Sequence, residues 1–267
     1  MLRAVLNFGL PALFIAGISR IPLRREFIAL PVSAILIMAV TLGVSLLVAR
    51  RMQLTRVDQG VLALSAISIN NSLLFPFALA GWGQEGFSQL ALFDFGHALM
   101  QGSLVYALAA TYGGHGTSAW AIVRRVASFP PLWALLLALA INVSGLVLPT
   151  MLTTVLGTMG RLILLLVVVA LGILFDARML RSTTVHVALL LRIALGLLLG
   201  LLCVKLFGLT GMTRSVVLLG SAAPIGFSAV VLASRENLNR DLAASAASIS
   251  VLFGLVYVPI ALWLLHP

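Results

Sequence analysis

The sequence predicts an all-α, polytopic membrane helix bundle with about nine transmembrane helices, folded as a single domain over residues 1–267. The composition supports this: 61% of the residues are hydrophobic and only 9% are charged, where a soluble domain has roughly 25% charged residues. The mean hydropathy is +1.16. Apolar stretches of about 20 residues, the length that spans a bilayer, follow one another along the whole chain.

The apolar stretches define the predicted spans. They are separated by short connections that carry charged residues, glycine or proline, as turns do. Only Pro149 and Thr150 separate the fifth stretch from the sixth, which predicts a tight helical hairpin. The nine predicted spans are 2–19, 27–49, 61–81, 90–112, 132–148, 151–175, 183–207, 215–233 and 243–265.

The net charge of +10 favours a membrane orientation signal over nucleic-acid binding. The basic residues occur in pairs between apolar stretches, as at Arg50-Arg51 and Arg124-Arg125, which is typical of short cytoplasmic loops. With a cytoplasmic N-terminus, ten of the 17 basic residues lie on the cytoplasmic side and five on the outer side. We therefore predict a multi-pass protein of the cell membrane with its N-terminus in the cytoplasm and its C-terminus outside.

A weak internal repeat relates residues of about 1–113 to residues of about 130–267. Pro76 interrupts the third stretch and Pro224 interrupts the eighth, and the triplet Leu-Val-Tyr follows each of them, at 104–106 and 255–257. Two interrupted helices at corresponding places are typical of inverted-repeat transporters, in which they form the binding site. We predict that the polar residues and prolines of both interruptions converge near the membrane centre: Asn70, Asn71, Pro76, Ser221, Pro224 and Ser228.

The interruptions have a chemical use. Proline removes a backbone donor and blocks a carbonyl one turn back, and groups freed in a membrane need partners in protein or water. Small residues, among them Gly226, flank Pro224 and would permit unwinding. Unwinding would leave half-helix N-termini, whose partial positive charge suits an anion. The alternative is a tolerated proline kink with asparagines that pack between helices.

Asp94, His97 and Gln101 are spaced by three and four residues, so they share one helix face. Asp94 is the only acid within a predicted span, and intramembrane acids are usually functional. Histidine is the side chain whose charge can change near neutral pH, so His97 is a candidate proton carrier beside an acid. The alternative is that Asp94 caps the start of its helix while His97 only packs.

Arg161 and Arg192 lie near the middle of their predicted spans. Gly196 and Gly200 follow Arg192 at intervals of four, which predicts that this face is turned into the protein. Arginine stays protonated even when buried, so Arg192 is a candidate counter-charge for an anion. A structural ion pair or a clamp on backbone carbonyls is the alternative.

No enzyme signature is present: the chain has no His-Glu-x-x-His, no Gly-x-Ser-x-Gly and no phosphate-binding Gly-x-x-x-x-Gly-Lys-Ser/Thr. The four histidines are scattered and Cys203 is the only cysteine. We therefore expect no enzyme activity, no cofactor and no metal site.

Several segments resemble the auxin efflux carrier family, which includes bacterial malate and malonate permeases and is related to the plant PIN carriers. The resembling segments are 223–233 with Asn237-Leu238 and 243–245, then 7–13, and 70–76 with 83–86. The resemblance implies the fold of the bile-acid symporters, two inverted five-helix repeats, with the first helix missing here. It also implies a core of the second to fourth and seventh to ninth spans, which moves against a panel of the others. The sequence departs from the family in having no glycine between Asn71 and Pro76.

The function implied is secondary transport of a small organic anion, such as a carboxylate or an auxin-like molecule, by alternating access. The alternatives are a non-transporting, receptor-like membrane protein with the same fold and a sodium-coupled symporter of the bile-acid type. The partners expected are the lipid bilayer, the anion, and a proton or a sodium ion as coupling ion, with a homodimer left open. Nucleic acid is not expected.

Overall fold

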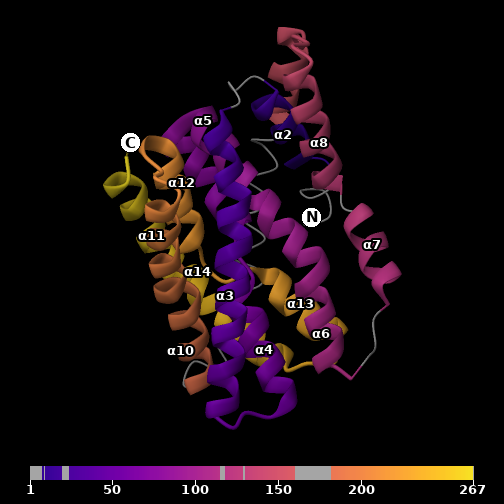
Figure 1. Cartoon of the computed structure of the whole chain (residues 1–267), viewed down its shortest axis with the longest axis vertical. Coiled ribbons are helices and arrows are strands. Elements are labelled where there is room, and N and C mark those ends of the chain that lie inside the picture. The colour runs from indigo at the N-terminus through magenta and orange to yellow at the C-terminus, as the bar shows by residue number, and fades with distance from the viewer. Residues whose placement is uncertain are drawn as a thin grey trace.

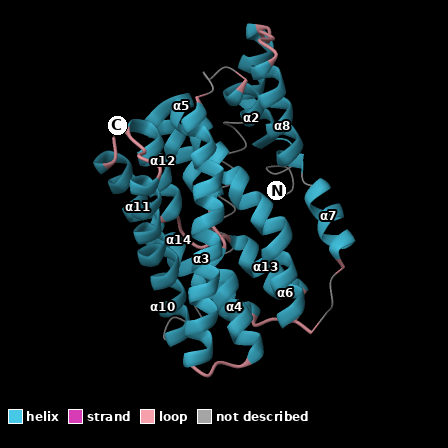
Figure 2. Cartoon of the chain, in the orientation of Figure 1, coloured by secondary structure: helices cyan, strands magenta, loops and turns pink. Residues whose placement is uncertain are grey.

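The computed structural model describes residues 8, 10–19, 24–114, 118–128, 130–159 and 182–266. Over these residues the chain is helical (Figure 2), and an isolated antiparallel bridge joins Ile69 to Ile225. The all-α prediction is therefore confirmed for the part of the chain that the structure describes.

Helices run in both directions along the long axis of the molecule (Figure 1). The α-helices before residue 160 are α2 (Leu10–Ile18), α3 (Ala29–Arg51), α4 (Arg56–Ile67), α5 (Asn71–Met100), α6 (Tyr106–Tyr112), α7 (Ala119–Ala127), α8 (Pro130–Val143) and the segment Thr150–Met159. Those after residue 181 are α10 (Thr183–Leu190), α11 (Gly196–Leu206), α12 (Gly211–Ser221), α13 (Phe227–Arg235) and α14 (Arg240–Leu264). A 3-10 turn, η2 (Arg25–Ile28), precedes α3, and two π-helical turns, η3 (Gln101–Val105) and η4 (Leu191–Leu195), continue α5 and α10.

Three unbroken helices among the described residues are long and apolar enough to cross a membrane. They are Arg25–Arg51 with 27 residues, Thr183–Leu206 with 24 and Arg240–Leu264 with 25. They coincide with the predicted spans 27–49, 183–207 and 243–265. Each also exposes large apolar side chains, such as Leu47, Leu198 and Val256, which is the surface expected of a helix solvated by lipid.

The prediction for the fourth span was wrong at its start. Gly83 has φ 64° and ψ −158°, so α5 comprises two helices that meet at this residue. The second helix then continues from Gln84 to Met100, well ahead of the predicted start at Leu90. Polar residues that suggested a loop are part of the helix: Gln89 Nε2 donates to Glu85 Oε1 at 3.2 Å, and Thr213 Oγ1 on α12 donates to Gln89 Oε1 at 2.9 Å.

The prediction that only Pro149 and Thr150 connect the fifth and sixth spans was also wrong, because the connection is longer. α8 ends at Val143, five residues before the predicted end, and the chain becomes helical again only at Thr150. Gly145 has φ 69°, a left-handed conformation that ends helices and that glycine adopts without strain. The predicted spans 2–19 and 151–175 fall only partly within the described residues, and Arg161 lies outside them.

α2 and α8 lie side by side at one edge of the molecule (Figure 1), where Asn142 Nδ2 donates to the Ile18 carbonyl at 2.7 Å. α2 meets the remaining helices through aromatic packing: the Phe14 ring lies 5.9 Å from that of Phe75 and 6.3 Å from that of Phe87, both on α5. α3 packs along α5 and α4, and α11 packs against α12 and α3. α2 and α8 belong to the first and fifth predicted spans, two of the three assigned to the predicted panel.

Membrane orientation follows as a prediction from the arginine bias. Reporter domains fused after Arg51, Gln84, Arg125 and Pro267 should read cytoplasmic, outside, cytoplasmic and outside, because basic loops are retained in the cytoplasm. Alkaline phosphatase, active only outside, and green fluorescent protein, fluorescent only inside, give opposite readouts at each site. A cytoplasmic signal after Pro267 would contradict a chain with an odd number of spans.

Candidate functional site

The third and eighth predicted spans are both broken helices, and the two breaks touch. α4 ends at Ile67 and α5 begins at Asn71, while α12 ends at Ser221 and α13 begins at Phe227. The Asn70 N–H donates to the Pro224 carbonyl at 2.8 Å, and the Gly226 N–H donates to the Ser68 carbonyl at 2.9 Å. These bonds form the Ile69–Ile225 bridge, so each break donates one backbone hydrogen bond to the other.

The two prolines differ in their position relative to the breaks. Pro224 lies within its break, but Pro76 lies inside α5, past the break at 68–70, where it is half-buried. The prediction that Pro76 interrupts its helix was therefore wrong. The break is made instead by Asn70, whose side-chain oxygen accepts the Leu73 N–H at 3.2 Å and caps the start of α5. Asparagine is among the strongest N-cap residues.

Two helix N-termini and several unpartnered polar atoms lie at the crossing. α5 begins at Asn71 and α13 begins at Phe227, so each has unbonded N–H groups and a partial positive charge here. Asn70 Nδ2, Asn71 Oδ1 and Ser228 Oγ are buried without a hydrogen-bond partner. Buried polar atoms are nearly always bonded, so these three atoms at the crossing are available to a ligand or a water molecule.

Gly226 permits the close approach of the two breaks. A Cβ atom at this position would lie 2.7 Å from the Ile69 carbonyl oxygen, closer than real side chains approach backbone. Pro224 in turn packs against α14, because a Cβ at Gly254 would lie 2.5 Å from Pro224 Cγ. Glycine is therefore required at both contacts.

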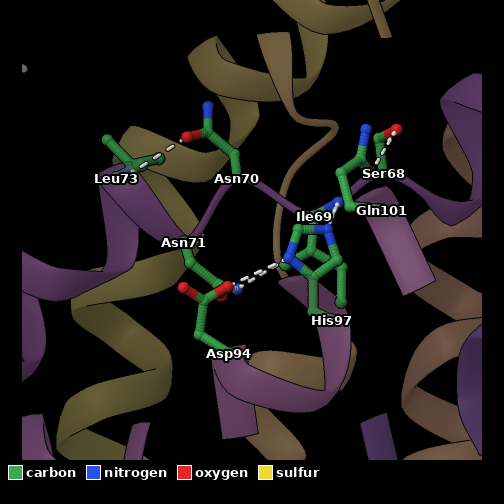
Figure 3. A network of polar contacts seen from close by, with 8 residues as sticks. All are labelled: Ser68, Ile69, Asn70, Asn71, Leu73, Asp94, His97 and Gln101. Atoms are coloured by element: carbon green, nitrogen blue, oxygen red, sulfur yellow. Dashed lines mark hydrogen bonds and ion pairs between the residues drawn. The ribbon is translucent and has the colours of Figure 1, made fainter. Parts of the chain in front are cut away.

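Asp94, His97 and Gln101 all face the first break (Figure 3). Asp94 Oδ1 accepts from Asn71 Nδ2 and lies 3.0 Å from His97 Nδ1. Gln101 Oε1 accepts from Ser68 Oγ at 3.4 Å. Because the helix begins soon after Gly83, Asp94 lies well inside it, and the alternative that Asp94 caps the helix start was wrong.

The bonding pattern assigns the tautomer of His97. The Ile69 N–H donates to His97 Nε2 at 3.2 Å, so Nε2 carries the lone pair and Nδ1 carries the hydrogen. His97 Nδ1–H then donates to the Asp94 carboxylate. The two side chains are 9% and 16% exposed, respectively, so the pair is largely removed from solvent.

Arg192 holds the other two helix ends. Its side chain is fully buried in η4, with Nη1 donating to the Ala66 carbonyl at 3.2 Å and Nη2 donating to the Ser221 carbonyl. These carbonyls belong to the last turns of α4 and α12, which lack intrahelical partners and carry partial negative charge. These contacts match the alternative in which Arg192 clamps backbone carbonyls, rather than the one in which it is the counter-charge of an anion. Gly196 and Gly200 face Ser221, as their spacing predicted.

Two polar residues of α14 also bind the second break, and sequence reasoning missed both as site residues. Tyr257 Oη donates to the Ala222 carbonyl at 2.5 Å, and Ser250 Oγ accepts the Ile225 N–H at 2.8 Å. The repeated Leu-Val-Tyr triplet was a signal for Tyr257. Ser250 gave no signal beyond being a hydroxyl within an apolar span.

Comparison with known proteins gave two matches. A family model described as "Membrane transport protein" matches residues 117–263, which is more than half of the chain. A protein of Methanothermobacter thermautotrophicus described as an uncharacterized transporter is 29% identical over 264 residues, which cover 97% of this chain and 86% of that protein.

Proposed function

Because the chain belongs to the membrane transport protein family, the auxin efflux carrier family that its sequence resembles, we propose that it is a secondary transporter of a small organic anion. This is a family of transporters and not of enzymes. The observation that carries the proposal is the crossing of two broken helices whose freed backbone groups bond to each other. Such crossings serve as binding sites in secondary transporters because they place helix ends and polar groups at membrane depth.

The charge of the substrate is inferred from the groups around the crossing. The N-termini of α5 and α13 favour an anion, and Asn70 Nδ2 and Ser228 Oγ supply unpartnered donors beside them. Both terminal nitrogens of Arg192 already bind carbonyls. Recognition would therefore rely on helix ends and neutral donors, which suit a carboxylate.

Alternating access would come from movement of the broken-helix core against the α2–α8 pair. The contact between them includes Phe14, Phe75 and Phe87, whose rings pack without directional bonds and can slide. The protein would work in the cell membrane with a cytoplasmic N-terminus.

Counterflow in proteoliposomes tests the transport function. Vesicles loaded with unlabelled mono- or dicarboxylates should accumulate the same labelled compound from outside, for at least one member of the panel. The measurement is made at two pH values, with and without sodium. If no compound exchanges although a cooperative thermal unfolding transition shows that the protein is folded, the receptor-like alternative is favoured. Strict sodium dependence would favour the bile-acid type of symporter.

Two substitutions test the proposed anion site. Ser228→Ala removes one unpartnered donor, and Asn70→Ser removes the other while keeping a capping oxygen for α5. Each should weaken apparent substrate affinity by about 10- to 150-fold, because a hydrogen bond to a charged group contributes about 1.5–3 kcal/mol. Ser33→Ala is the matched control, since Ser33 is fully buried on α3 outside both breaks. Unchanged affinity in both site variants would place the substrate elsewhere.

A further inference from the structure

A single side chain, His97, connects the acid on α5 to the backbone of the crossing. Its Nδ1 contacts Asp94 and its Nε2 accepts the Ile69 N–H, while Ile69 itself bridges Ile225 of the second break. Figure 3 shows the Asn71 side chain directed toward Asp94 and His97, and the Asn70 side chain directed away from them. The first break thus has one side facing this pair and another bearing the unpartnered Asn70 donor.

We propose that His97 Nε2 is the proton-binding atom of this protein, and that its protonation acts on the crossing by breaking the hydrogen bond with the Ile69 N–H. The inference rests on the transport function proposed above and names its coupling ion.

Protonation of His97 Nε2 and its hydrogen bond with the Ile69 N–H exclude each other. Nε2 holds the one ring lone pair available for a proton, and the Ile69 N–H occupies it. Once Nε2 is protonated, two donors face each other and the bond cannot persist. The Nδ1–H bond to Asp94 is kept, and the pair changes from a net charge of −1 to a neutral imidazolium–carboxylate pair.

The link operates in both directions. A conformation that withdraws Ile69 from His97 exposes the lone pair and so raises the affinity of Nε2 for a proton. By thermodynamic reciprocity, proton binding favours that same conformation to the same extent. The state of the crossing and the occupancy of the proton site are therefore coupled.

Few other charges act on the pair. The described α-helices that pack against α5 are α2, α3, α8, α12 and α14, and their charged side chains lie in a first or last turn: Arg50 and Arg51 on α3, Arg214 on α12, and Arg240 and Asp241 on α14. On α5 itself, Glu85 lies nine residues before Asp94, and on α4 Arg56 and Asp58 lie in the first turn. The ionisable groups at the breaks themselves are Asp94, Arg192 on the Ala66 and Ser221 carbonyls, and Tyr257 on the Ala222 carbonyl. Asp94 is the one that contacts His97 among the described residues.

The charge of the pair also affects the anion site. Asp94 binds the side chain of Asn71, the first residue of α5, so its negative charge lies near the helix end proposed to attract the substrate. Protonation of His97 neutralises the pair and removes that repulsion. A proton and an anion would therefore bind together, which predicts symport.

Nuclear magnetic resonance tests the proton site without any substrate. Protein labelled with ¹⁵N-histidine in lipid nanodiscs should show His97 as the Nδ1–H tautomer with a bare Nε2 at alkaline pH, with the signal assigned by its loss in His97→Gln. On acidification, Nε2 should gain a proton over the same pH range in which the Ile69 amide loses protection from hydrogen exchange. The opposite tautomer, or protection of Ile69 that is unchanged while Nε2 protonates, would overturn the proposal.

Transport of radiolabelled malonate tests the coupling. His97→Gln places an amide oxygen near the position of Nε2 and keeps an acceptor for Ile69 without a titrating group, whereas His97→Asn loses that acceptor. At clamped voltage, a gradient of about one pH unit should raise wild-type accumulation about tenfold, because one pH unit equals about 1.4 kcal/mol per proton. His97→Gln should lose this response while exchanging malonate faster than His97→Asn.

The outcomes separate this inference from the transport proposal. If wild-type protein moves no carboxylate while the resonance results are as expected, the anion-transport proposal fails and the proton site stands. If His97→Gln keeps the full response to the pH gradient, the assignment to His97 fails. A response that survives in His97→Gln but is lost in Asp94→Asn would move the proton to the carboxylate.

Discussion

Replacement of Arg192 by methionine should abolish transport and lower the thermal unfolding temperature of the purified protein. The substitution keeps an apolar side chain of similar length but leaves the Ala66 and Ser221 carbonyls without their donors. Each unsatisfied carbonyl in a buried site costs about 1–3 kcal/mol. Because these carbonyls end α4 and α12, we expect both broken helices to lose their fixed positions. Unfolding in detergent and substrate exchange in proteoliposomes measure the two effects.

A lysine at position 192 distinguishes the two roles of the arginine. Arg192→Lys keeps the charge but replaces the planar fork by a compact ammonium group, which is poorly suited to hold two separate carbonyls. If Arg192 acts as a clamp, Arg192→Lys should lower the unfolding temperature, while the folded protein binds the anion with unchanged affinity. If Arg192 acts as a counter-charge, Arg192→Lys should change neither the unfolding temperature nor the affinity. Lys205→Met is the control, since Lys205 is an exposed cation on α11; wild-type behaviour of Arg192→Met would contradict both roles.

Gly196→Ala should cause the second large loss. A Cβ at Gly196 would lie 2.2 Å from the Ser221 carbonyl oxygen and 2.8 Å from Arg192 Nη2, so α11 would have to move away from the end of α12. The added methyl would therefore displace the carbonyl that Arg192 binds. We expect transport to fall below detection and the unfolding temperature to drop.

Gly43→Ala is the matched control for this substitution. Gly43 lies inside α3 and has no atom within 4 Å of the position of an added Cβ. Alanine is favoured over glycine within a helix by about 1 kcal/mol, so Gly43→Ala should leave transport intact and raise stability slightly. Equal tolerance of both alanines would show that α11 and α12 are not tightly packed.

Much of the architecture could be predicted because the bilayer imposes simple rules. Long apolar runs identified the three unbroken membrane helices, and Pro224 with its small neighbours identified the second broken helix, while the asparagines before Pro76 lay at the break of the first. The interval of four from Arg192 to Gly196 and Gly200 correctly indicated an inward face. These inferences depend only on local sequence and on the cost of placing polar groups in lipid.

The errors arose where distant partners decide the local structure. Pro76 was an obvious candidate for the break, but the carbonyl of Pro224 and the capping side chain of Asn70 place the break earlier. Glu85 and Gln89 suggested a loop because they are polar. In the structure Gln89 lies within a helix, where Thr213 on α12 donates a hydrogen bond to its side chain. The carbonyl partners of Arg192 likewise belong to other helices. No pattern in a single stretch of sequence contains this information.

The reciprocal bonds between the two breaks determine when the protein can be completed during synthesis. Ser68 and Asn70 find their partners in Gly226 and Pro224, which the ribosome adds more than 150 residues later. At about 5–20 residues per second, synthesis of the second broken helix follows that of the first by roughly 8–30 s. During that interval its freed N–H and C=O groups need hydrogen-bond partners from water or the insertion machinery, because lipid chains cannot form hydrogen bonds. Completion of the fold is therefore a late event, and a nascent chain that stops before α12 presents an unsatisfied membrane segment to quality control.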